Sequence, residues 1–121
     1  MPEVEGSDGS STPLVLDAQN FRRILIDALN DGMLLLGESS RLAIYIHIEK
    51  KYGIKPDVFP EQLERFSKGL QDIFGVGAKI LEQSVAKSLY SKLGLGFKEH
   101  ENWTIVDYVK DARKTVLSFR T

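Results

Sequence analysis

The sequence predicts an all-α fold of about five helices, packed as a compact bundle of αα-hairpins. Apolar residues recur at spacings of three and four along most of the chain, which is the period of a helix with one buried face. Glycines and prolines separate these stretches and leave only short connections. The length of 121 residues suits one domain. We expect a disordered tail over residues 1–14 and a single helical domain over residues 15–121.

The composition excludes several classes of protein. The chain has no cysteine, so disulfides, thiolate zinc sites and cysteine nucleophiles are absent. Its net charge of −1 lacks the basic excess of a dedicated nucleic-acid binder. No apolar run approaches the roughly 20 residues that span a membrane, and the N-terminus lacks the basic and apolar regions of a signal peptide. We expect a soluble cytoplasmic protein that does not associate with membranes.

The first helix begins after Asp17, which is a suitable N-cap. Its buried face is predicted from residues spaced by three and four: Phe21, Ile24, Leu25, Ala28 and Leu29. Asn30, Asp31 and Gly32 then form a strong turn signal, so we expect a break or kink there. The alternative is a longer helix that tolerates Gly32 and ends at Gly37.

Residues 41–53 are compatible with a strand or a helix. Three β-branched residues alternate along the segment, as in a strand: Ile44, Ile46 and Ile48. The flanks favour a helix, because Ser39 and Ser40 offer an N-cap and Gly53 suits the left-handed position after a helix. We therefore expect a helix. It is apolar on most sides, so we expect it to be central.

Two further helices meet at the corner formed by Gly75, Val76 and Gly77. Pro60 is expected in the first turn of the earlier helix. The buried stripe of that helix is Leu63, Phe66, Leu70, Ile73 and Phe74. The later helix, roughly residues 76–93, is expected to bury Ala78, Leu81, Val85, Leu89 and Leu93 and to turn Glu82 outward. Gly94 ends it.

The last helix begins at a variant of the capping box made by Thr104 and Asp107. Its regular stripe is Ile105, Val109, Ala112, Val116 and Phe119. This helix has more apolar surface than one contact requires, which favours a homodimer with Tyr108, Val116 and Phe119 in the interface. The alternative is that these side chains complete the core of the monomer.

The corner between the two middle helices resembles the helix-hairpin-helix motif of proteins that bind DNA without sequence specificity. Phe74, Gly75, Val76 and Gly77 match that pattern, and Gly75, Gly77 and Lys79 could bind a phosphate at the start of a helix. Leu81 stands where the motif has a small residue. We therefore favour a tight turn in which glycine permits close packing. Nucleic-acid binding stays an alternative.

No set of residues predicts catalysis, a cofactor or a metal. His47 lies between two isoleucines and is expected in the core or in an interface. His100 lies in a charged loop that lacks a coordination cage. The carboxylates of Glu38, Asp72 and Glu82 have no identifiable acid–base partner, so we do not expect an enzyme. A small-ligand site around His47 and the tyrosines is a further alternative.

Three stretches resemble a small all-helical archaeal domain, the Nitrosopumilus-output-domain type. They are Leu36-Gly37-Glu38, the helix end at residues 49–54, and Ile73-Phe74-Gly75 followed by Ala78 and Leu81-Glu82. The resemblance implies a regulatory module, alone or linked to a receiver domain, that acts through protein contacts. It implies no catalytic residues. Our leading hypothesis is a non-enzymatic regulatory or interaction domain with an unidentified protein partner, self-associating through apolar helix faces.

Overall fold

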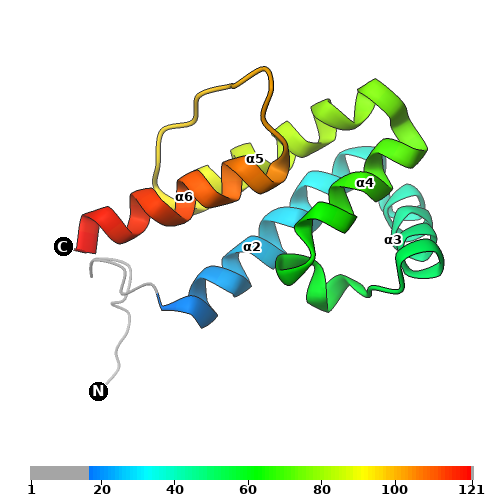
Figure 1. Cartoon of the computed structure of the whole chain (residues 1–121), viewed down its shortest axis with the longest axis horizontal. Coiled ribbons are helices and arrows are strands. Elements are labelled where there is room, and N and C mark those ends of the chain that lie inside the picture. Colours follow the sequence, from blue (N-terminus) through cyan, green and yellow to red (C-terminus); the bar gives the residue numbers. More distant parts are fainter. Residues whose placement is uncertain (1–16, 121) are drawn as a thin grey trace.

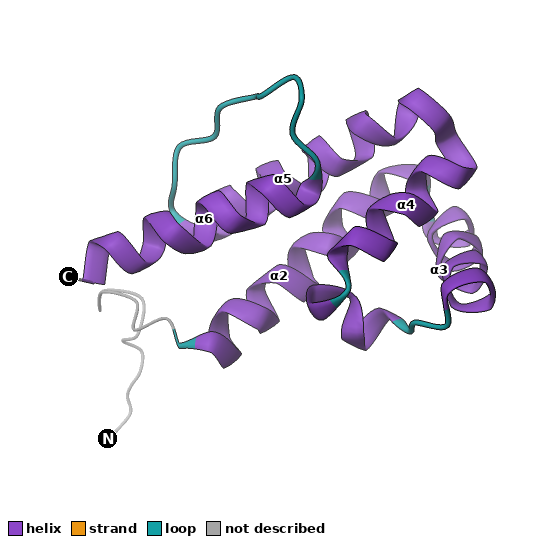
Figure 2. Cartoon of the chain, in the orientation of Figure 1, coloured by secondary structure: helices purple, strands orange, loops and turns teal. Residues whose placement is uncertain are grey.

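The computed structural model describes residues 17–120, with side chains described as far as Val116. Within this range the α-helices are α2 (Ala18–Met33), α3 (Glu38–Tyr52), α4 (Leu63–Phe74), α5 (Ala78–Leu93) and α6 (Ile105–Arg120), and there is no strand (Figures 1 and 2). Short 3-10 helices join them: η2 (Leu34–Leu36), η3 (Pro56–Glu61) and η4 (Gly75–Gly77). The all-α prediction is confirmed. The tail expected over residues 1–14 lies outside the described range.

Helices α2 and α5 run side by side in opposite directions and form the spine of the bundle (Figure 1). The break expected at Gly32 lies close to the end of α2 at Met33, after which the 3-10 helix η2 continues to Leu36 and stops at Gly37. A Cβ on Gly32 would lie 2.4 Å from Cγ2 of Val85, so this glycine lets the two helices approach closely. Asp17 caps α2 as expected, because its Oδ1 accepts the Asn20 N–H at 2.8 Å.

Residues 41–53 form helix, as the flanks indicated, and Gly53 ends α3 with a φ of 71°. The expected serine cap is wrong, because α3 begins at Glu38 after Gly37 and has no side-chain cap. The expectation of a central helix is also wrong. Ile44 and Ile48, four residues apart, are buried, whereas Ile46 is 54% exposed. Alternation along the sequence places Ile46 on a different helix face.

Buried side chains from all five α-helices form one apolar cluster. The buried stripes predicted for α5 and for the described part of α6 are confirmed. The other predicted stripes hold in part, since Ile73 is 40% exposed and Ile24, Leu63 and Phe74 are only partly buried. Glu82, which was expected to face outward, is buried with 3% exposure. Pro60 lies in η3 rather than in the first turn of α4, which begins at Leu63.

No helix in the described range is long and apolar enough to cross a membrane.

Candidate interaction surface

One end of the bundle carries a group of exposed aliphatic side chains, which we call the apolar end. Val76 is 97% exposed, Ile80 69% and Leu35 67%. The whole group consists of Leu34, Leu35, Leu36, Leu42, Ile46, Ile73, Val76 and Ile80. These residues come from η2, α3, the last turn of α4, η4 and the first turn of α5, which gather at one end in Figure 1. Over residues 17–116, no large hydrophobic side chain outside this group is exposed.

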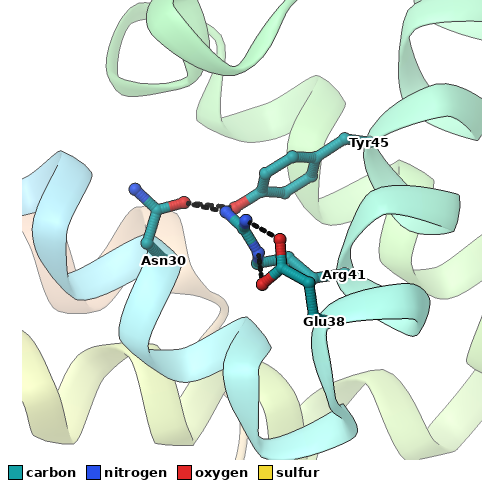
Figure 3. Close-up of polar contacts among 4 residues, drawn as sticks. All are labelled: Asn30, Glu38, Arg41 and Tyr45. Atoms are coloured by element: carbon teal, nitrogen blue, oxygen red, sulfur yellow. Dashed lines mark hydrogen bonds and ion pairs between the residues drawn. The ribbon is translucent and has the colours of Figure 1, made fainter.

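Hydrogen bonds to Asn30 fix α3 to α2, and so hold the α3 part of the apolar end in place. The Asn30 Oδ1 accepts from Nη1 of Arg41 at 3.0 Å and from the hydroxyl of Tyr45 at 2.8 Å (Figure 3). The Arg41 guanidinium also pairs with the Glu38 carboxylate one turn earlier. Burial raises the pKa of the Tyr45 hydroxyl, which keeps it protonated as a donor. Leu42, an exposed residue of the apolar end, directly follows Arg41, so these contacts also fix the position of Leu42.

A second polar cluster joins α3 to α4 around Asp72. Its Oδ2 accepts from the Tyr52 hydroxyl at 2.6 Å and lies 3.0 Å from Nζ of Lys51 and 3.6 Å from Nε2 of His47. The hydrogen bond from Tyr52, followed by that from Lys51, holds the pKa of the Asp72 carboxyl below its usual value. The His47 side chain is 39% exposed at this cluster, so it is not a core residue.

The small-ligand site around His47 and the tyrosines stays a prediction: His47 meets Tyr52 at the Asp72 carboxylate, whereas Tyr45 packs against Asn30 of α2. A hollow of about 250 Å³ lies beside Tyr45, between α2 and η3, but His47 does not line it. His100 instead stacks on Trp103, with ring centroids 3.7 Å apart. No group of three or more potential metal ligands occurs among residues 17–120.

An open groove of about 510 Å³ lies between the corner and the loop that precedes α6. Its lining is Gln71, Gly75, Val76, Ala78, Lys79, Glu82, Glu101, Asn102, Trp103 and Thr104. Val76 belongs to both the groove and the apolar end, so the two features are continuous. In the described part of the chain, neither Lys79 nor Glu101 has an ion-pair partner.

Glu82 closes the inner side of this groove. Its Oε1 accepts from the Ile105 N–H at 2.7 Å, and its Oε2 accepts from the Ser67 hydroxyl at 3.0 Å. Burial raises the pKa of the Glu82 carboxyl, partly opposed by the hydrogen bond from Ile105. From the sequence we expected Glu82 to face solvent. Its spacing from Ala78 and Val85 also fits the buried stripe.

Two of the three residues of the predicted phosphate site line the groove. Gly75 and Lys79 line it, and Gly75 has a φ of 57°. The Gly75 N–H donates to the Gln71 carbonyl within the turn. The corner otherwise presents Val76 and Ile80, both strongly exposed, beside the single cation Lys79. Gly77 belongs to the same short helix but does not line the groove.

The predicted interface on the last helix is corrected for two residues. Tyr108 and Val116 are buried within the chain, so neither offers surface to a second copy in this structure. The Tyr108 hydroxyl accepts from the His100 N–H at 2.9 Å and donates to the His100 carbonyl at 3.1 Å. It thereby fixes the loop before α6. The Phe119 side chain lies outside the described residues.

Comparisons with protein-family models, with curated proteins and with solved structures find no match to this chain. The resemblance to the Nitrosopumilus-output-domain type therefore stays a prediction from the sequence.

Proposed function

We propose that this chain is a cytoplasmic, non-enzymatic regulatory or interaction domain that self-associates through its apolar end. The observation that carries the proposal is the concentration of exposed aliphatic side chains there, from Leu34 in η2 to Ile80 in α5. The largest apolar patch on a monomeric protein is typically roughly 300–600 Å² and is often functional. Eight large side chains gathered at one end therefore favour a surface that a partner covers.

The charges beside these side chains favour a second copy as that partner. Along α3 there are charged residues of both signs: Glu38, Arg41, Glu49, Lys50 and Lys51. A surface with both signs can pair with an identical surface without net repulsion. A partner whose surface carries mainly one sign of charge would gain little electrostatic attraction there.

The environment of Glu82 supports a non-enzymatic role. This buried carboxylate sits next to the groove, where an acid–base group would be useful. Each of its oxygens, however, already accepts a hydrogen bond from the chain itself, one from Ile105 and one from Ser67. Its position is thus explained by packing and by capping α6.

The test is the solution mass of the purified chain by size-exclusion chromatography with light scattering. We expect a dimer of the 13.6 kDa chain that the Leu35→Glu variant converts to a folded monomer. Leu35 is strongly exposed, so the added charge should leave the fold intact, as circular dichroism would verify. A carboxylate at an interface core opposes association because burial disfavours its charged form.

Ser91→Glu is the matched control. It adds the same charge at an exposed position in the last turn of α5, at the opposite end of that helix from Ile80. This variant should remain dimeric. A wild-type chain that is monomeric up to high micromolar concentration would refute the proposal, and so would a dimer that Leu35→Glu leaves unchanged.

A further inference from the structure

The corner places a protruding side chain directly beside a hollow. Val76 stands between Gly75 and Gly77, neither of which has a side chain to cover it, and it is the most exposed large hydrophobic residue described. The same residue forms part of the rim of the 510 Å³ groove. A projection and a recess therefore adjoin on one face of the molecule.

The groove suits an apolar side chain from outside. Its volume lies within the roughly 300–1,000 Å³ range of sites that bind small groups. Trp103 and Ala78 contribute apolar lining, and polar side chains such as Gln71 and Asn102 surround them. Trp103 is itself held by contact with Tyr108, at 5.1 Å between ring centroids, so the recess has a stiff wall.

An adjacent projection and recess have a particular consequence for symmetry. A two-fold dimer uses the same patch on both copies, so each copy must supply both complementary parts within that patch. Val76 and the groove meet this requirement. A projection far from its recess would instead favour head-to-tail chains.

The unpaired charges of the groove fit the same arrangement. Lys79 and Glu101 both line it, and neither has an ion-pair partner in the described part of the chain. A two-fold contact allows Lys79 of each copy to pair with the partner's Glu101. The surface thus carries charge that complements its own copy.

We infer that the groove is the docking site for a second copy of this chain, with Val76 of each copy in the groove of the other and Lys79 facing the partner's Glu101. The inference rests on the proposed self-association and names the residues that form the contact between the two copies. Two features identify a second copy as the occupant: Val76 adjoins the groove that it would fill, and Lys79 and Glu101 carry opposite charges.

The test exploits the two charges by mixing variants, with dimer dissociation constants measured by analytical ultracentrifugation. Lys79→Glu and Glu101→Lys each create like-charge pairs across the two-fold contact, and each should weaken the dimer by about tenfold or more. An equimolar mixture of the two variants restores opposite charges in both contacts of a heterodimer. We expect the mixture to regain most of the wild-type affinity.

Mixing cannot repair a contact made within one chain, so recovery in the mixture requires contact between copies. Val76→Asp should also weaken the dimer without unfolding the monomer, because this side chain is almost fully exposed. Ser91→Glu again serves as the control. If the mixture does not recover affinity, or if these variants dimerise like wild type, the groove is not the contact.

The failure of this inference can be distinguished from failure of the proposed function. A dimer that Leu35→Glu disrupts but that the groove variants leave unchanged would retain self-association through the apolar end and overturn docking in the groove. A monomeric wild-type chain would overturn both.

Discussion

The Glu82 carboxylate on α5 accepts a hydrogen bond at 2.7 Å from the N–H of Ile105, the first residue of α6. The first N–H groups of a helix have no partner within it, and the positive end of the helix dipole favours a negative charge. The second carboxylate oxygen is satisfied by Ser67. These two donors explain how an ionisable group is accommodated with 3% exposure.

Replacing Glu82 with Gln should alter how stability depends on pH. Burial raises the pKa of the Glu82 carboxyl above the ordinary value of 4.5, so the folded chain retains a proton that the unfolded chain has already lost. The contribution of Glu82 to stability is full below pH 4.5 and declines as pH rises through the folded-state pKa. Glutamine can accept from Ile105 and donate to the Ser67 oxygen without titrating.

Thermal melts between pH 4.5 and 8 at constant ionic strength would measure this effect. The Tm difference should move in favour of Glu82→Gln as pH rises. Glu99→Gln, the same substitution at an exposed loop position, is the matched control. A pH-independent difference for Glu82→Gln would contradict the prediction. Glu82→Ala should destabilise the fold by about 1–3 kcal/mol, because two donors lose their acceptor.

Gly32→Ala should destabilise the chain by roughly 1–3 kcal/mol, the range for overpacking a core. The new Cβ would lie 2.4 Å from the Val85 side chain and 3.0 Å from its backbone, so α2 and α5 must separate. Chemical denaturation would give the free energy of unfolding. Gly96→Ala is the control, because a Cβ there meets nothing within 4 Å. A double-mutant cycle with Val85→Ala should show partial relief, and simple additivity would argue against this contact.

Tyr108→Phe should loosen the loop before α6 and cost roughly 1–3 kcal/mol, since the His100 N–H loses its partner. The His100 carbonyl loses one of two donors and keeps the Trp103 N–H at 3.3 Å. Trp103 is the only tryptophan in the chain and stacks on His100, so its fluorescence reports on this loop. We expect its emission to shift to longer wavelength. Tyr52→Phe removes an exposed hydrogen bond to Asp72 and should leave the emission unchanged. An unchanged spectrum in Tyr108→Phe would show that the hydroxyl does not position the loop.

Local signals in the sequence were sufficient for much of the fold. The cap at Asp17, the capping box at Thr104 and Asp107, and the left-handed glycines Gly53 and Gly94 all occur where the sequence placed them. Each depends on residues close in the chain, so its physics can be read from a short window. The close packing at Gly32 was missed because it depends on Val85, which comes from a distant helix.

The candidate surface could be predicted only in part. The corner at Gly75 and Gly77 was identified as unusual, and it does form one wall of the groove. The opposite wall comes from Trp103, whose position depends on tertiary packing around Tyr108. Periodicity also fails to say which apolar residues stay exposed, because Ile46 and Ile48 have the same chemistry and opposite environments. For the same reason Tyr108 and Val116, which were expected at the surface, are buried.

The pairing of α2 with α5 has a consequence for how the protein is made. Asp31 and Ser88 are hydrogen-bonded across 57 positions of sequence. At typical synthesis rates of about 5–20 residues per second, the ribosome needs roughly 3–11 seconds to add that stretch. During that time the apolar face of α2, with Phe21, Leu25 and Leu29, has no α5 to cover it. If translation stalls after α2 but before α5, the nascent chain therefore exposes an apolar surface to chaperones and to neighbouring nascent chains on the same mRNA.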